Sequence, residues 1–259
     1  MTEATCREPG TPCRVSLMVR DLGRTQDFYG GLFGWKFAQM AGSERLGHQV
    51  RAFLDGQEVA GIGQLPSGRR QSIAWTTYLA TDDADATAAA IRGWGGTVGV
   101  GPLDAGEDGR LALVSDPAGA TFGIRQARER SAVTAADGHG TPVRRELVTR
   151  EPGWATAFYR SVFGYEVTRA GGRADGTVTL SLGGRAVATV HGVGEAPGPV
   201  RGSYWTTYFE VDDTDAAVRL VAGAGGHVIV PARETAAGRA ATVADPEGAV
   251  FGVVRSAGR

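Results

Sequence analysis

The chain has 259 residues, of which 42% are hydrophobic and 21% charged, and its formal net charge is −1. This length is sufficient for a sizeable core and predicts two domains, while the near-neutral charge argues against general attraction to nucleic acid or an anionic membrane. No apolar run approaches the ~20 residues of a membrane span, and the first residues lack an apolar signal core, so we expect a cytoplasmic protein. The two cysteines, Cys6 and Cys13, lie close together and are interpreted as free thiols.

The first half of the chain predicts two consecutive βαβββ units. A strand from Arg14 to Arg20 leads into a helix that begins at Asp21 and stops at Gly34. Three strands are then expected at 35–40, 50–54 and 58–65. The second unit has a strand from Trp75, a helix over 83–94, and strands near 97–100, 111–115 and 120–125.

The second half repeats the first. Trp75-Thr76-Thr77-Tyr78 returns as Trp205-Thr206-Thr207-Tyr208, and Asp116-Pro117-Ala118-Gly119 returns as Asp245-Pro246-Glu247-Gly248. Residues 127–138 are small, polar and charged, which is typical of a linker. The sequence therefore predicts an α+β protein with one domain over 11–126, a linker over 127–140 and a second domain over 141–255.

This pattern resembles the vicinal oxygen chelate superfamily, which includes glyoxalases, extradiol dioxygenases and bleomycin-resistance proteins. Within it, the chain is similar to two-domain, glyoxalase-like actinobacterial proteins, some of which lie in antibiotic clusters. The resemblance implies that each pair of βαβββ units curves a mixed sheet around one cavity. It rests on motifs that occur in both halves, which in the first half are Arg20-Asp21-Leu22, Phe28-Tyr29, Leu32-Phe33-Gly34, Asp82-Asp83 and Asp116-Pro117-Ala118-Gly119.

The resemblance also assigns metal-ligand positions on the first, fifth and eighth strands of each half. In this sequence they hold Arg14, Thr76 and Gly123 in the first half, and Arg144, Thr206 and Gly252 in the second. A protonated arginine cannot donate a lone pair, glycine has no side chain, and a neutral threonine hydroxyl is a poor ligand. We therefore expect no metal and no other cofactor.

Strand alternation predicts which side chains line the implied cavities instead. In the second half these are Arg144, Glu146, Thr206, Tyr208 and Glu210, and we expect this cavity to be the stronger candidate for ligand binding. In the first half they include Arg14, Thr76 and Tyr78. In an alternative interpretation these charged residues have only a structural role, because Arg144 and Glu146 can form a salt bridge with each other or with Glu210.

Two functional hypotheses follow. The first is a metal-free protein that binds a bulky aromatic natural product or pathway intermediate, for sequestration, self-resistance or as a biosynthetic helper. The second is a metal-free biosynthetic enzyme, an isomerase, cyclase or oxygenase acting on a polyketide. It would use Glu146 or Glu210 as general base, with Tyr208, a further catalytic candidate, or Arg144 as oxyanion partner. A third and broader hypothesis is a metabolite-binding scaffold with no link to a pathway. In each case we expect a small-molecule ligand as the binding partner, and a pathway enzyme as a candidate second partner. The chain is expected to be a monomer or a homodimer.

Overall fold

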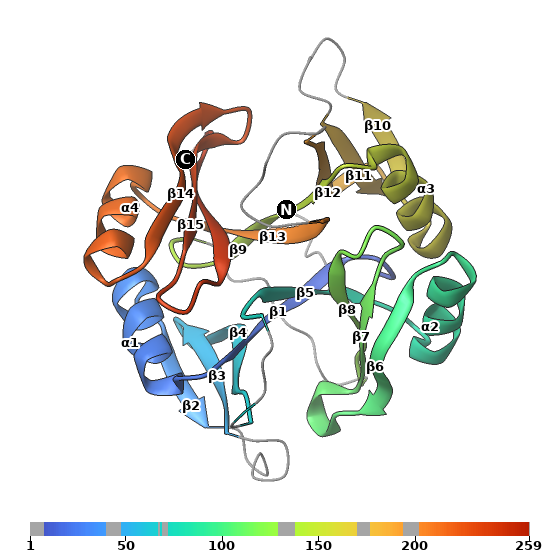
Figure 1. The fold of residues 1–259 in the computed structure, drawn as a ribbon, viewed down its shortest axis with the longest axis horizontal. Coiled ribbons are helices and arrows are strands. Elements are labelled where there is room, and N and C mark those ends of the chain that lie inside the picture. Colours follow the sequence, from blue (N-terminus) through green and yellow to red (C-terminus); the bar gives the residue numbers. More distant parts are fainter. Residues whose placement is uncertain are drawn as a thin grey trace. The chain divides into compact units, whose positions relative to one another are not determined.

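The first half of the chain forms βαβββ twice, as the sequence predicts (Figure 1). A computed structural model describes residues 8–39, 48–66, 68, 72–128, 138–169, 177–193 and 202–258. The elements of the first half are β1 (Pro12–Val19), α1 (Leu22–Phe33), β2 (Lys36–Gln39), β3 (Gln49–Leu54), β4 (Gln57–Gln64), β5 (Trp75–Ala80), α2 (Ala84–Gly93), β6 (Thr97–Asp104), the 3-10 turn η2 (Gly106–Asp108), β7 (Arg110–Ser115) and β8 (Thr121–Gln126).

The second half repeats this order of elements. They are β9 (Pro142–Thr149), α3 (Pro152–Phe163), β10 (Glu166–Arg169), β11 (Val178–Leu182), β12 (Arg185–Gly192), β13 (Tyr204–Glu210), α4 (Thr214–Gly223), β14 (His227–Thr235), β15 (Gly238–Ala244) and β16 (Val250–Ser256). The strands form two mixed eight-stranded sheets with the orders β2-β3-β4-β1-β5-β8-β7-β6 and β10-β11-β12-β9-β13-β16-β15-β14. The predicted α+β class is therefore confirmed.

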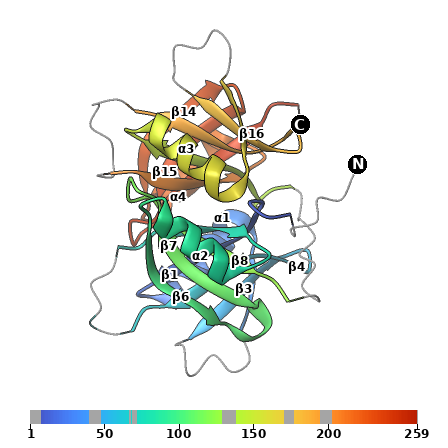
Figure 2. The ribbon, with the colours of Figure 1, turned by 90° about the vertical axis from the view of Figure 1, so that its right-hand side faces the viewer.

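Spatial contacts group the chain into two compact units, and each takes one βαβββ module from each half of the sequence. Unit 1 comprises Met1–Cys13, Thr76–Thr134 and Arg144–Thr206, and unit 2 comprises Arg14–Trp75, Ala135–Val143 and Thr207–Arg259. Within unit 1, α2 packs beside α3 (Figure 2), and within unit 2, α1 packs beside α4 (Figure 1). Residues 129–137, most of the predicted linker, lie outside the described residues, and the domain boundaries at 11–126 and 141–255 stay a prediction.

Local sequence explains where α1 begins and ends. The side chain of Asp21 accepts a hydrogen bond from the backbone N–H of Arg24, which caps the first turn. Gly34 ends the helix in the left-handed conformation at φ 73°, where a side chain would be strained. Between these caps, one face of α1 carries the large buried side chains Phe28, Tyr29 and Phe33. No helix in the described part of the chain combines the length and hydropathy of a membrane span.

Strand alternation directs one face of each inner strand into a core. On β1, Val15, Leu17 and Val19 are all fully buried and pack with the apolar face of α1. The same cluster contains Phe209 and Phe251 from the second half of the sequence. The core of unit 2 is thus built by both halves, and the core of unit 1 joins residues such as Leu79 and Phe122 to Leu147 and Phe158 in the same way.

A buried Trp–Tyr–Asp chain of hydrogen bonds crosses each of these cores. In unit 2, Trp75 Nε1 donates to the Tyr29 hydroxyl over 2.9 Å, and this hydroxyl donates to Asp245 Oδ2 over 3.0 Å. In unit 1, Trp205 donates to Tyr159 over 2.8 Å, and Tyr159 donates to Asp116 over 3.2 Å.

In both Trp–Tyr–Asp hydrogen-bond networks, burial and the neighbouring aspartate keep the tyrosine hydroxyl protonated. Burial, together with the adjacent Asp245 carboxylate, raises the pKa of Tyr29 well above its ordinary value. Burial and Asp116 do the same to the pKa of Tyr159. Each phenol therefore remains a hydrogen-bond donor to its carboxylate at neutral pH.

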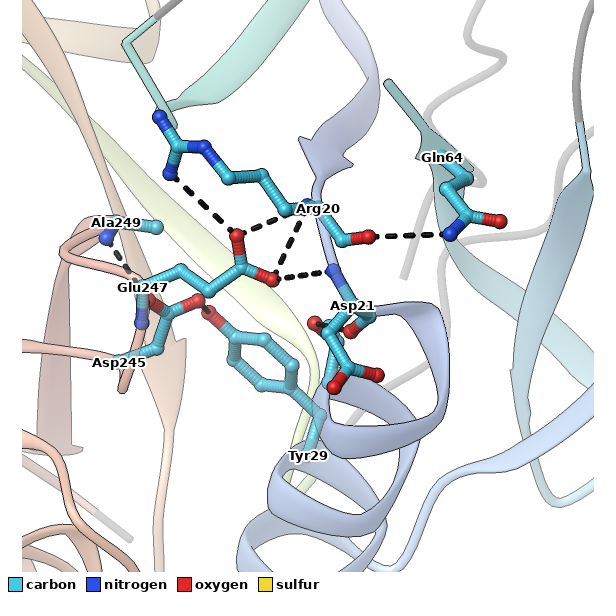
Figure 3. A network of polar contacts seen from close by, with 8 residues as sticks. Arg20, Asp21, Tyr29, Gln64, Asp245, Glu247 and Ala249 are labelled. Carbon is cyan, nitrogen blue, oxygen red and sulfur yellow. Dashed lines mark hydrogen bonds and ion pairs between the residues drawn. The ribbon is translucent and has the colours of Figure 1, made fainter. Parts of the chain in front are cut away.

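Unit 2 adds a carboxylate contact (Figure 3) that has no counterpart among the described residues of unit 1. Oε1 of the Glu247 carboxylate accepts hydrogen bonds from the backbone N–H of Arg20 at 3.1 Å and of Asp21 at 2.8 Å, and Oε2 lies 3.6 Å from the Arg20 guanidinium. At the repeat-related position unit 1 has Ala118. There the N–H of Glu151 donates instead to the Thr149 hydroxyl.

We predict that Tyr159→Phe and Tyr29→Phe each lower the free energy of unfolding by about 1–3 kcal/mol, because each leaves a buried Trp N–H and a carboxylate oxygen without their partner. Urea unfolding followed by circular dichroism measures the loss. Tyr204→Phe, which removes a half-buried hydroxyl of the same type, is the control and should change stability by less than about 0.5 kcal/mol. Equal effects at all three positions would contradict this role of the buried chains.

Candidate functional site

One sheet face in unit 1 carries polar side chains where the opposite face carries the core. Leu147 on β9, Val190 on β12 and Leu180 on β11 are fully buried against the α3 side. Alternation sends their neighbours Arg144, Glu146, Thr179, Thr189 and His191 to the other face. The register places Glu146 beside Thr189, and Thr189 beside Thr179. We call these five residues, together with Tyr204, the unit-1 polar face.

An ion pair forms the centre of the unit-1 polar face. Arg144 Nη2 lies 3.0 Å from Glu146 Oε1, and the same nitrogen donates to the Thr189 hydroxyl over 3.3 Å. The side chains of Arg144 and Glu146 are 24% and 13% exposed. The structure therefore brings together two residues that the sequence predicted for one site, and they form the salt bridge that the alternative, purely structural interpretation also expects. Water screens their charges only in part in this setting.

Sequence analysis named only Arg144 and Glu146 of this face and missed its other four residues, Thr179, Thr189, His191 and Tyr204. Burial and the charge of Glu146 raise the pKa of Tyr204, at the start of β13, so its phenol stays protonated beside the carboxylate. The His191 ring contacts the Thr177 hydroxyl over 3.3 Å. Alternation along this strand predicted that Thr206 and Tyr208 share one face. It would have included Tyr204 as well if the predicted strand had begun at Tyr204 instead of Trp205.

The corresponding face in unit 2 is built differently. Arg14 on β1 lies 3.6 Å from Glu58, and Arg51 on β3 lies 3.3 Å from the same carboxylate. Where unit 1 has Thr189 and His191, unit 2 has Gly61 and Gly63. A Cβ on Gly61 would lie 2.7 Å from Arg14 Nη2, and one on Gly63 would lie 2.7 Å from Met18 Sδ. The side chains of Arg14 and Met18 therefore lie over the glycines of β4.

Tyrosine rings cover the third metal-ligand position of both halves. Tyr78 on β5 is in register with Gly123 on β8, and Tyr208 on β13 with Gly252 on β16. A Cβ on either glycine would lie 2.1 Å from the ring of its tyrosine. Glycine is required at these positions because the ring of the neighbouring strand takes the place of a side chain.

The remaining predicted site residues are distributed over both units. Thr76 is half-buried and Thr206 is 3% exposed, and both belong to unit 1 together with Tyr78. Tyr208 and Glu210 belong to unit 2, as Arg14 does. The predicted grouping of Arg144, Glu146, Tyr208 and Glu210 in one cavity stays a prediction.

Glu210 has a local structural partner. It is 4% exposed, and its two oxygens accept hydrogen bonds from the backbone N–H and the hydroxyl of Ser256. This pairing ties the end of β13 to the end of β16. The carboxylate of Glu210 thus already has two donors within its own unit.

The residues at the assigned ligand positions do not fit a divalent metal ion. Arg14 and Arg144 are each engaged with a carboxylate, and the two glycine positions lie beneath tyrosine rings. Over the described ranges, no group of three or more His, Cys, Asp or Glu side chains is arranged to hold a metal. The neutral hydroxyls of Thr76 and Thr206 are the only oxygen donors left in the assigned sets, and they are weak ones.

A family model described as Glyoxalase/Bleomycin resistance protein/Dioxygenase superfamily matches residues 13–124 and 141–253. The chain belongs to this superfamily, which confirms the resemblance seen in the sequence. Its two repeats account for the two similar sheets.

Individual relatives and solved structures agree with this family. The chain is 36% identical to a Mycobacterium bovis protein named "Putative glyoxylase CFP32", over 96% of this chain and 95% of that protein. It is 34% identical to the anthracycline biosynthesis protein DnrV of Streptomyces peucetius, over 95% and 93%. A Mn(II)-bound glyoxalase from Novosphingobium aromaticivorans superposes with a TM-score of 0.63 at 17% identity, over 95% of this chain and 82% of that one. At this identity the last comparison shows the fold alone.

We predict that Gly252→Ala destabilises the protein by about 1–3 kcal/mol, because the new methyl group overlaps the Tyr208 ring. In a Tyr208→Ala background the same change should have little effect. Urea unfolding of the four proteins of this double-mutant cycle measures the coupling. The control is Gly31→Ala on α1, where a Cβ meets nothing within 4 Å, and which should be neutral or stabilising. Additive effects of Gly252→Ala and Tyr208→Ala would refute the ring placement.

Proposed function

We propose that the protein binds a small organic molecule, without a metal ion, on the unit-1 polar face. The observation that carries the proposal is the half-buried Arg144–Glu146 pair, flanked by Thr189 and Tyr204 on a sheet face whose other side is occupied by the core. A few polar groups placed on a rigid sheet are typical of small-molecule sites.

The differences between the halves favour unit 1 over unit 2. In unit 2 the side chains of Arg14 and Met18 lie over Gly61 and Gly63. In unit 1 the equivalent strand positions present the hydroxyl of Thr189 and the imidazole of His191. At these two positions the unit-1 face therefore offers hydrogen-bonding side chains that the unit-2 face lacks.

The ligand class proposed is a bulky, aromatic natural product or pathway intermediate. Support comes from two relatives that are named anthracycline biosynthesis proteins, DnrV and DauV, each at least 33% identical over 95% of this chain. A protonated tyrosine such as Tyr204 can stack on a flat ligand and donate a hydrogen bond to it. Sequestration, self-resistance or a helper role in biosynthesis would each use such binding.

The same face also supports a metal-free enzyme as a second candidate. Glu146 is 13% exposed and lies near a protonated phenol, so a carboxylate base and a hydrogen-bond donor are close together. Glu210 is the weaker candidate base, because both of its oxygens accept hydrogen bonds from Ser256. Recovery of a chemically changed ligand after incubation would select the enzyme.

We predict that a thermal-shift screen over aromatic polyketides and their precursors finds a stabilising ligand. Tyr204→Ala should weaken its binding by about 1–3 kcal/mol, as loss of an aromatic anchor does. Calorimetric titration measures the change. Tyr78→Ala, which removes a first-half ring that lies over Gly123 on β8, is the control and should bind the ligand as the unaltered protein does. Loss of binding in Tyr78→Ala alone would move the site to the first half.

We also predict that the purified protein contains no stoichiometric transition metal, because its assigned ligand positions lack competent donors. Elemental analysis of the protein, with and without prior chelator treatment, tests this. About one zinc, iron or manganese ion per chain, lost together with ligand binding on chelation, would show that the metal-free assignment is wrong.

A further inference from the structure

We propose that the unit-1 polar face selects a neutral ligand bearing hydroxyl and carbonyl oxygens over an anionic one, and that Glu146 is the residue that sets this selection. The proposal rests on the proposed function and adds to it the charge class of the ligand.

The charge balance of the face is the first argument. Arg144 is matched by Glu146 at 3.0 Å within the face itself. The remaining members are the hydroxyl residues Thr179, Thr189 and Tyr204 and the imidazole of His191. The face therefore presents a compensated ion pair in place of a free positive charge, and a ligand carboxylate would have to displace Glu146 from Arg144 to gain an ion pair.

The burial of Glu146 is the second argument. Its side chain is only 13% exposed, so water screens its negative charge incompletely. A ligand carboxylate placed on the same face would meet a like charge in this partly desolvated setting, and such juxtapositions strongly reduce affinity. A neutral ligand avoids this repulsion, and its hydroxyl can donate a hydrogen bond to the carboxylate.

The neighbouring hydroxyls are the third argument. Thr189 Oγ1 accepts a hydrogen bond from Arg144, which leaves its own O–H to donate to a carbonyl oxygen. Tyr204 lies within the electrostatic influence of Glu146 and remains protonated. Two O–H donors next to a carboxylate acceptor match a ligand edge that carries both carbonyl and hydroxyl oxygens.

The repeat supplies a matched comparison. At the position of Glu146 the first half has Ser16, and at the position of Tyr204 it has Ala74. The carboxylate of the unit-2 face is Glu58 on β4, which is engaged by both Arg14 and Arg51. Glu58→Gln is therefore a control that removes an arginine-paired carboxylate of similar exposure from the other unit.

The experiment uses a dihydroxyanthraquinone carboxylic acid and its methyl ester, which differ in charge while sharing the ring system. Affinities are measured by fluorescence quenching at pH 8. The proteins are the unaltered chain, Glu146→Gln and Glu58→Gln. Thermal unfolding of each protein without ligand checks that it is folded.

We expect the unaltered chain to bind the ester at least about tenfold more tightly than the acid. Glu146→Gln should reduce or reverse this ratio, because it removes the negative charge that repels the ligand carboxylate, and Glu58→Gln should leave the ratio unchanged. Equal or tighter binding of the acid by the unaltered chain, or an unchanged ratio in folded Glu146→Gln, would overturn the charge selection while leaving the proposed binding function intact. Binding of neither compound at their solubility limits would count against the proposed function and this inference together.

Discussion

The hydrogen bond between a helix tyrosine and a turn aspartate is the interaction on which both cores depend. In each unit the Asp Oδ1 atom accepts two backbone N–H groups of its own turn, from Ala118 and Ala120 at Asp116, and from Glu247 and Ala249 at Asp245. The Oδ2 atom accepts the tyrosine hydroxyl. One carboxylate thus fixes the shape of a turn and the position of a helix at once, in a place where unmet hydrogen bonds are costly.

This bond also joins the two halves of the sequence. Tyr29 comes from the first half and its partner Asp245 from the second, whereas Tyr159 comes from the second half and Asp116 from the first. Trp35 Nε1 donates to the carbonyl of Gly140, and the Tyr165 hydroxyl donates to the carbonyl of Gly10, with the same exchange of halves. Neither compact unit can complete its core from one half alone.

The two halves of the sequence share their core residues and differ in the residues of their polar faces. Core positions of the two halves carry matching side chains, as Phe28-Tyr29 and Phe158-Tyr159 do, because close packing tolerates few changes of volume. The polar faces differ at nearly every position. Thr189 occupies the repeat position that Gly61 has in the first half, and Tyr204 occupies that of Ala74. A duplicated fold can therefore hold two different sites, or one site and one closed face, on scaffolds of the same architecture.

The sequence by itself determined the order of elements, the repeat, the family and the inward or outward direction of the strand residues, since these follow from local periodicity, turn chemistry and capping. It also identified Arg144 and Glu146 as neighbours on one face, because two residues separated by one on a strand must point the same way. The tertiary structure decided what periodicity cannot encode. It showed that each compact unit joins modules from both halves and that Tyr78 and Tyr208 cover Gly123 and Gly252. It also showed that Ser256 engages Glu210 and that the charge of Glu146 raises the pKa of Tyr204. Each of these depends on which strands and helices meet in space, and pairing between segments far apart in the chain is set by the packing of the whole core rather than by any local pattern.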